Sequence, residues 1–512
     1  MRMADFILAL DQGTTSTKAF LLDQTGELKA GTPVPITQHY PAEGYVEHDP
    51  EEIYRSVLKA VANVLRENPQ AVGNIDSMGI TNQRETTIAF GRNTLRPVMN
   101  AIVWQCRRTT EICTRPELTE ASDMILNKTG LKLDPYFSAT KIRWIIEENP
   151  DIAEFVASGD ILFATVDGYL VYRLTGKKVF ATDYSNAART MLFNISTLDY
   201  DDELLALFGV PRACLAEARP SCSDFGNLTF DPDTLNEIGM DYDDIKYLMT
   251  LNGVPIKAVC GDQPSALFGQ YAVHEGDVKT TYGTGCFTLM NVGTKPVISQ
   301  NGLLTSPAWS INGETVYALE GSAFQGGSII SWLKDEMKLI DKPSDVDGLC
   351  TSIEDNGGVY LVPAFTGLGA PYWNPEARGV IVGLTRGSGR AHIVRAGVEA
   401  IAYQVAELVN LMMSDTGIAA KQMKVDGGTC ASDFMMQFQS DLLGIKITRA
   451  RSDEMTAQGV GILAGLSSGF FASVKSVYVL YKAAKTYEPA ASSYSMMKLM
   501  EGYQEAVRRA VK

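Results

Sequence analysis

A strand, a polar turn rich in glycine and threonine, and a second strand occur in both halves of this chain. In the first half the apolar residues 6–10 stop at Asp11-Gln12-Gly13-Thr14-Thr15, and apolar residues resume over 19–22. In the second half residues 277–281 lead into Tyr282-Gly283-Thr284-Gly285, and a strand-like segment follows to residue 292. Apolar runs on either side of such a turn are typical of β-hairpins. The repeated hairpin predicts two copies of one structural plan.

The elements after each hairpin support this prediction. Residues 52–67 place apolar side chains on one helical face, and residues 75–80 return to a strand. A long helix is predicted around 393–412, then a strand over 423–425 and a helix with Ser432 as its N-cap. With 512 residues the chain exceeds the size of a single hydrophobic core. We therefore predict an α/β protein with two domains, residues 1–270 and 271–512, and a ligand cleft between them.

Composition excludes several classes of function. A net charge of −15 argues against a nucleic-acid partner, because phosphate backbones require clustered Lys and Arg. We expect no membrane span, since no run of about 18–20 apolar residues occurs. The first ten residues lack a secretory pattern, and the eight cysteines form no Cys-x-x-Cys pair. We expect a cytoplasmic protein with reduced thiols, in which backbone donors hold any anionic ligand.

The two polar turns are candidates for phosphate binding. Backbone N–H groups and hydroxyls in a Gly/Thr turn can converge on one phosphate, so two facing loops could hold a triphosphate from both sides. Such turns are often only turns, and Asp11 could simply cap one. A carboxylate beside phosphate donors is explained if a divalent cation lies between them. Asp426-Gly427-Gly428, between a strand and a helix, is a further candidate for contacting an adenosine.

Several longer segments resemble one known family. They include Gly44–Pro50, Gly79–Thr87, Val103–Thr109, Asp134–Phe137, Thr182–Tyr184, Arg189–Asn194, Gly261–Gln263, Thr281–Phe287 and Pro363–Trp373. Over nearly its whole length the chain is similar to the FGGY carbohydrate kinases, and most similar to those members that phosphorylate glycerol. The resemblance implies two ribonuclease H-like domains of the actin/Hsp70 type with a central catalytic cleft. It also implies ATP-dependent phosphorylation of glycerol to sn-glycerol 3-phosphate, with ATP and Mg²⁺.

The resemblance further implies the polyol-binding residues: Arg84, Glu85, Tyr136, Asp262 and Gln263 toward the hydroxyls, and Trp104 and Phe287 as an apolar wall. A triol calls for such a mixture, because each hydroxyl donates and accepts. Arg84 and Glu85 would point to opposite faces of a continuing strand, so both reach one ligand only if the strand ends near Thr81-Asn82. Without the resemblance, a surface ion pair would be the simpler interpretation of these two residues.

Asp262 is the predicted catalytic base. It follows the strand-like residues 256–259 and Gly261, and a carboxylate of ordinary pKa can accept a hydroxyl proton late in a loose phosphoryl transfer. The alternative is that Asp262 caps the helix through Ala266 and Leu267. With Asp11, it would bind Mg²⁺.

The resemblance places the nucleotide at Thr14, Thr15, Lys18, Thr284, Gly327, Ser331, Gly428 and Thr429. Three features depart from the family pattern. Lys18 replaces the usual arginine, Ser331 the usual glutamine, and residues 429–433, ending at Asp433, lack an asparagine expected near adenine. These departures leave the preference for the nucleotide base open.

Two alternative functions remain at this stage. The first is an FGGY kinase of another polyol or ketose, such as erythritol or a pentulose. The second is a non-catalytic ATP-binding regulator, which predicts loss of the carboxylates, although Asp11 and Asp262 are both present. Family resemblance also implies a homodimer or homotetramer.

Overall fold

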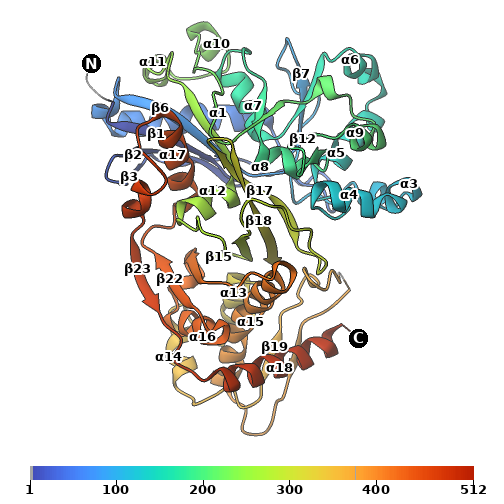
Figure 1. Cartoon of the computed structure of the whole chain (residues 1–512), viewed down its shortest axis with the longest axis vertical. Helices are drawn as coiled ribbons and strands as arrows, with labels where there is room; N and C mark the ends of the chain where they lie inside the picture. Colours follow the sequence, from blue (N-terminus) through green and yellow to red (C-terminus); the bar gives the residue numbers. More distant parts are fainter. Residues whose placement is uncertain (1–3, 375, 512) are drawn as a thin grey trace.

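Two mixed sheets with the same strand order organise the molecule (Figure 1). In the computed structural model, which describes residues 4–374 and 376–511, the first sheet has the order β14-β6-β1-β2-β3, and β4 also pairs with β2. Strand β1 runs antiparallel to β2 and parallel to β6, which is parallel to β14. The strands are β1 (Phe6–Gln12), β2 (Ser16–Asp23), β3 (Leu28–Ala30), β4 (Val34–Pro35), β6 (Ile75–Asn82) and β14 (Ile256–Gly261).

The second sheet repeats this arrangement and adds a strand at each edge. Its order is β17-β18-β16-β15-β21-β22-β23, with β15 antiparallel to β16 and parallel to β21. The strands are β15 (Asp277–Tyr282), β16 (Cys286–Asn291), β17 (Leu304–Ile311), β18 (Glu314–Ala323), β21 (Gln422–Asp426), β22 (Lys446–Ala450) and β23 (Ala483–Tyr487). Both predicted hairpins, and the ribonuclease H-like fold class, are thereby confirmed.

Shorter strand pairs and helices surround the first sheet. The pairs are β5 (Glu47–His48) with β8 (Ala101–Ile102), β7 (Ile88–Gly91) with β9 (Ile161–Ala164), β10 (Ala181–Asp183) with β13 (Glu217–Arg219), and β11 (Phe193–Asn194) with β12 (Asp199–Tyr200). The helices are α1 (Pro50–Glu67), α2 (Thr110–Cys113), α3 (Pro116–Glu120), α4 (Ser122–Thr129), α5 (Ser138–Glu148), α6 (Ala153–Ala157), α7 (Val166–Leu174), α8 (Tyr184–Ala187), α9 (Asp202–Phe208), α10 (Pro232–Glu237), α11 (Tyr242–Met249) and α12 (Asp262–Gly269).

The second half of the chain contributes the remaining elements. They are α13 (Gly327–Asp335), α14 (Asp345–Thr351), α15 (Arg390–Thr416), α16 (Asp433–Leu443), α17 (Met455–Ser468), α18 (Ser493–Ala510) and the pair β19 (Tyr360–Val362) with β20 (Val380–Val382). Ser432 is the N-cap of α16, as predicted, because its side chain accepts from the N–H of Met435. No helix in the described part of the chain is long and apolar enough to cross a membrane.

Helix α1 illustrates how the sequence determines an element. Asp49 precedes it, and its carboxylate accepts a hydrogen bond from the N–H of Glu51, while Pro50 occupies the first turn. Proline is favoured there because that N–H has no partner within the helix. The apolar face, including Ile53 and Val57, is fully buried. The predicted helix is confirmed and begins two residues earlier than expected.

One helix of the second half packs on the first sheet. Helix α17 contacts β1, β6 and β14, and Figure 1 shows it in red among the blue strands. Ala457 and Val460 of this helix share a buried cluster with Ile7 and Ala9 of β1. The predicted boundary between the two domains, at residues 270/271, stays a prediction. In the packing, the chain returns to the first sheet after completing most of the second.

Candidate active site

The turn between β1 and β2 presents Gly13, Thr14 and Thr15. The N–H of Gly13 donates to the carbonyl of Ser16 at 3.0 Å, which closes the turn. The indole Nε1 of Trp104 donates to Thr14 Oγ1 at 2.9 Å. This contact joins the predicted polyol wall to the predicted phosphate loop.

Asp11 lies at the base of this turn, opposite Lys18 in the strand register. Burial, together with the charges of Asp262 and Glu454 and opposed by Lys18, raises the pKa of Asp11 to about 7. Lys18 itself pairs with Glu454, with 2.8 Å between Nζ and Oε1. Among the described residues, no donor lies within hydrogen-bonding distance of the Asp11 carboxylate. An anionic group so placed would be stabilised by a cation.

Arg84 and Glu85 lie just beyond β6, which ends at Asn82 as predicted and is followed by Gln83. Both residues are buried, with 3% and 1% exposure, so a surface ion pair is excluded. Arg84 donates through Nη1 and Nη2 to the two carboxylate oxygens of Glu320, at 2.7 and 3.0 Å. Arg189 Nε donates to Glu85 Oε1 at 2.5 Å, and its Nη2 lies 3.4 Å from Glu320 Oε1. We call Arg84, Glu85, Arg189 and Glu320 the buried ion network.

The buried ion network crosses from one sheet to the other. Arg84 follows β6 of the first sheet, whereas Glu320 lies in β18 of the second. Burial alone would raise the pKa of Glu320, but Arg189 and Arg84 hold it at about 2. Glu320 is therefore a fixed anion that orients two guanidinium groups.

Asp262 is the first residue of α12, and Gly261 is the N-cap of this helix. The alternative in which Asp262 is the N-cap is therefore wrong. Arg84 Nε donates to Asp262 Oδ1 at 2.9 Å, as does the N–H of Gln263 at 2.7 Å. A Cβ at position 261 would lie 2.6 Å from Arg84 Cδ, so only glycine permits this approach. The Asp262 side chain remains one-third exposed, in contrast to the buried Arg84 that holds it.

Aromatic rings form one side of the same region. Trp104 and Tyr136 pack edge to face with 5.8 Å between ring centroids. Burial, followed by the charge of Glu85, raises the pKa of Tyr136, so its hydroxyl stays protonated.

The predicted polyol residue Gln263 is held by a lysine of the second half. Gln263 Oε1 accepts a hydrogen bond from Lys279 Nζ at 2.8 Å.

Phe287 comes from the second sheet. It pairs with Ser322 on β18, two residues from Glu320, so Phe287 and Glu320 share one face of the sheet. Because Glu320 contacts Arg84 of the first half, this face looks toward the polyol residues. The side chain of Phe287 is half-buried.

Three glycine-containing segments meet on the second sheet. The N–H of Gly326 donates to the carbonyl of Thr284, and that of Gly327 to Gly283, each at 2.8 Å. A Cβ at position 327 would lie 2.7 Å from Thr429 Oγ1. Helix α13 begins at Gly327, and helix N-termini favour anions. The residues predicted to hold the nucleotide, Thr284, Gly327, Gly428 and Thr429, are thus brought together.

Comparison with known proteins agrees with this geometry. Residues 6–269 match the N-terminal domain of the FGGY family of carbohydrate kinases, and residues 278–468 match the C-terminal domain. The chain belongs to the FGGY family of carbohydrate kinases. It is 46% identical to the glycerol kinase of Carboxydothermus hydrogenoformans and to that of Symbiobacterium thermophilum, over 99% of this chain and 98% of each relative.

Solved structures give the same result. Plasmodium falciparum glycerol kinase with ADP superimposes with a TM-score of 0.91 at 35% identity, covering 100% of this chain and 99% of that one. A xylulose kinase from Lactobacillus acidophilus superimposes with a TM-score of 0.86, covering 98% of each chain. At 22% identity the xylulose kinase shows the fold alone.

Two positions of this FGGY kinase bear on the open base preference: Ser331, a predicted nucleotide residue, and Asp433, which ends the segment without the expected asparagine. Ser331 lies on α13, one turn beyond Gly327, and is exposed. Asp433, at the start of α16, accepts hydrogen bonds from Lys485 Nζ at 2.7 Å and from the Tyr487 hydroxyl at 2.5 Å. Its carboxylate is therefore held by residues of the β23 segment.

Sequence reasoning missed Glu320, the role of Arg189, and Lys141. Lys141 Nζ donates to the carbonyls of Glu85 at 3.0 Å and of Tyr136 at 2.7 Å, which fixes the backbone of both. The available signal for Glu320 was a lone carboxylate in the apolar run 316–323. Arg189 stood within a matched segment, but no local pattern linked it to Glu85, 104 positions away.

Proposed function

We propose that this chain catalyses the ATP-dependent phosphorylation of glycerol to sn-glycerol 3-phosphate. The observation that carries the proposal is the 46% identity to glycerol kinases over 99% of the chain. The placement of Arg84, Glu85 and Asp262 beside the Trp104–Tyr136 pair supports it. These residues offer donors, acceptors and an apolar wall of the kind a small triol requires.

Arg84, Glu85, Tyr136, Asp262 and Gln263 bind the hydroxyls in this proposal, and Trp104 and Phe287 lie against the carbon chain. Arg84 is bonded to Glu320 and Asp262 before any substrate arrives. Such preorganised groups lose little freedom on binding. Substrate would meet a site that is already formed.

Asp262 is the proposed catalytic base. Its partly exposed carboxylate accepts from Arg84 Nε on Oδ1, whereas Oδ2 has only a long contact of 3.5 Å with Gln263 Nε2 and can also accept from a substrate hydroxyl. It orients that hydroxyl for in-line attack on the γ-phosphate and accepts the proton late, since deprotonation contributes little in a loose transition state.

The nucleotide is assigned to Thr14, Thr15 and Lys18 from the first half and to Thr284, Gly327, Ser331, Gly428 and Thr429 from the second. Asp11 and Asp262 would hold Mg²⁺, which would supply charge neutralisation at the transferring phosphate. The raised pKa of Asp11 beside Asp262 supports this assignment. The described residues contain no group of three or more potential metal ligands, so phosphate oxygens and water would complete the coordination.

The remaining assignments follow from the same proposal. The eight free cysteines are consistent with a cytoplasmic enzyme. We propose a homodimer or homotetramer, which sedimentation equilibrium measures directly. The partner molecule is a small polyol, and closure of the two domains over the substrates would exclude water.

A coupled assay for ADP tests the function. Glycerol, erythritol, dihydroxyacetone and pentuloses are compared at equal concentration, and we expect the highest kcat/KM for glycerol. A higher value for a pentulose would replace glycerol by a ketose. If the folded protein releases no ADP from ATP with any of these substrates, the kinase assignment is overturned.

A further inference from the structure

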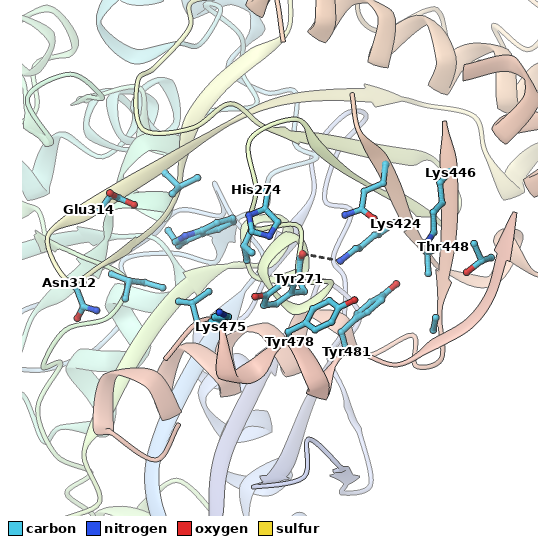
Figure 2. A pocket seen from close by; sticks show the side chains of 18 residues that line it. Tyr271, His274, Asn312, Glu314, Lys424, Lys446, Thr448, Lys475, Tyr478 and Tyr481 are labelled. Carbon is cyan, nitrogen blue, oxygen red and sulfur yellow. Dashed lines mark hydrogen bonds between the residues drawn. The ribbon is translucent and has the colours of Figure 1, made fainter. Parts of the chain in front are cut away.

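A large cavity lies away from the candidate active site. Its volume is about 1170 Å³, and it is bordered by the segment after α12, the β17–β18 hairpin, strands β21 and β22, and the 3₁₀ turn Ser476–Leu480 (Figure 2). Its lining includes Gln422 and Lys446, the first residues of β21 and β22. Gly428 and Thr429 follow the other end of β21, so cavity and active site lie at opposite ends of these parallel strands.

A buried lysine without a carboxylate partner lies in this cavity. Lys424 is 4% exposed, and its Nζ donates one hydrogen bond, to the carbonyl of Tyr271 at 2.9 Å. Figure 2 shows this bond and the ring of Tyr481 beside the ammonium group, whose Nζ lies 4.3 Å from the ring centroid. An ammonium group has three donors, and no Asp or Glu of the described residues lies within 4 Å of this one. The Tyr481 hydroxyl is also buried without a hydrogen-bond partner among them.

The charge of the cavity is positive although the chain carries −15. Lys424 is joined in the lining by Lys446 and Lys475, against a single carboxylate, Glu314. Burial, opposed by the charge of Asp277 and assisted by that of Lys446, lowers the pKa of Lys424 to about 8. An anion placed between Lys424 and Lys446 would relieve their repulsion.

Aromatic side chains also line the cavity and make part of its wall apolar. Trp309 and Tyr271 are buried in its wall, and Tyr478 packs on Tyr271 with 5.0 Å between centroids. Tyr478 is 59% exposed, so part of its ring remains available for contact with a ligand. Apolar walls with a few polar groups are typical of small-molecule sites, and the volume exceeds what an inorganic anion needs.

We propose that this cavity binds a small aromatic anion, with its carboxylate or phosphate on Lys424 and Lys446 and its ring against Trp309 and Tyr478. The site is independent of the proposed function, because it shares no residue with the polyol or nucleotide assignments. Tyr481 would supply one neutral hydrogen bond to the same head group.

Isothermal titration calorimetry on the full chain tests the proposal with phenyl phosphate, benzoate and inorganic phosphate. We expect one site with a dissociation constant below about 1 mM for phenyl phosphate or benzoate, and binding at least about tenfold weaker for inorganic phosphate, which lacks the ring. Whichever aromatic probe binds more tightly identifies the head group. No heat from either aromatic probe, or equal affinity for inorganic phosphate, would overturn the proposal.

Variants locate the binding. Lys424→Met keeps the apolar stem and should weaken binding by at least about tenfold, since bonds to charged groups are the stronger ones. Lys446→Met and Tyr478→Ala alter exposed side chains, so they replace Lys424→Met in the binding test if that variant fails to fold. Each should weaken binding by about threefold or more. Lys421→Met, an exposed lysine outside the lining, should bind as the unchanged protein does. Unchanged affinity in the first three, or competition by ATP, would refute the site.

Discussion

The proposed polyol side and the proposed nucleotide side of the active site differ in how they are built. On the polyol side Arg84, Arg189 and Glu320 are buried, and both arginines pair with Glu320 of the second sheet. On the nucleotide side the pair Lys18–Glu454 is about one-third exposed, and Ser331 is open to solvent. The first region uses charged side chains in fixed positions, whereas the second uses backbone groups of glycine-containing turns. Substitutions should therefore affect folding and chemistry together on the polyol side, and nucleotide affinity alone on the other.

The largest effect is expected at Asp262, where the two regions meet. Asp262→Asn keeps an oxygen for Arg84 Nε but removes the proton acceptor, so kcat should fall by about 10²–10⁴-fold. Steady-state assays of ADP release measure this loss, and thermal unfolding verifies the fold. Asp233→Asn, which removes one exposed carboxylate on α10, is the matched control and should leave kcat unchanged. Near-native turnover by a folded Asp262→Asn variant would remove Asp262 from the catalytic role.

The next effect is expected in the buried ion network. Glu320→Gln leaves Arg84 and Arg189 without their shared anion, and breaking a buried pair in this way costs about 3–5 kcal/mol of unfolding free energy. Urea unfolding measures the loss. Glu203→Gln breaks the exposed contact with Lys128 and should cost less than about 1 kcal/mol. Equal losses in the two variants would show that burial does not distinguish the network.

Acidification sharpens the same comparison. The pKa of Glu320 falls from 4.5 to about 2 on folding, so its stabilising contribution is present above pH 4.5 and is lost as the pH falls toward 2. The difference in unfolding free energy between the unchanged protein and Glu320→Gln should be constant from pH 7 to about 5 and shrink below that. A difference that grows as the pH falls would contradict the assignment.

A smaller effect is expected at Lys18. Lys18→Met removes a partly exposed ion pair, so unfolding free energy should change by less than about 1 kcal/mol. The KM for ATP should rise by about 5–10-fold while that for glycerol stays constant, because the charge is assigned to the phosphates. Lys18→Arg should restore most of the affinity. An unchanged KM for ATP would place Lys18 outside nucleotide binding.

The smallest effect is expected at Ser331. Its exposed position on α13 predicts that Ser331→Gln leaves kcat intact and changes the ratio of KM values for ATP and GTP by less than about threefold. Assays with both nucleotides measure the ratio. A change of more than tenfold in this ratio would show that residue 331 contributes to discrimination between the nucleotide bases.

The sequence predicted the local elements of the site and missed the distant partners. The hairpin of β1 and β2, the end of β6 before Arg84 and the start of α12 near Asp262 depend on neighbouring residues, so local patterns reveal them. The partner Glu320 is 236 positions from Arg84, and Glu454 is 436 positions from Lys18. Such pairings follow from how the sheets meet, which hydrophobic periodicity does not specify.

The buried placement of Arg84 and Glu85 shows the same limit. Two adjacent charged residues are usually exposed, and only their separate partners, Glu320 and Arg189, make burial possible. The positive φ of 59° at Glu85 turns the chain so that its side chain reaches Arg189. The sequence does not predict this left-handed conformation, because glutamate favours neither turns nor the left-handed region.

The return of α17 to the first sheet makes the two halves of the chain inseparable. Ile7 and Phe20 of the first half share one buried cluster with Trp309, Ala318 and residues of α17 from the second. A fragment ending at residue 270 would lack helix α17, which packs on its sheet, although residues 6–269 match the family's N-terminal domain. Residues 1–270, although they match a family domain, are therefore only part of a folding unit.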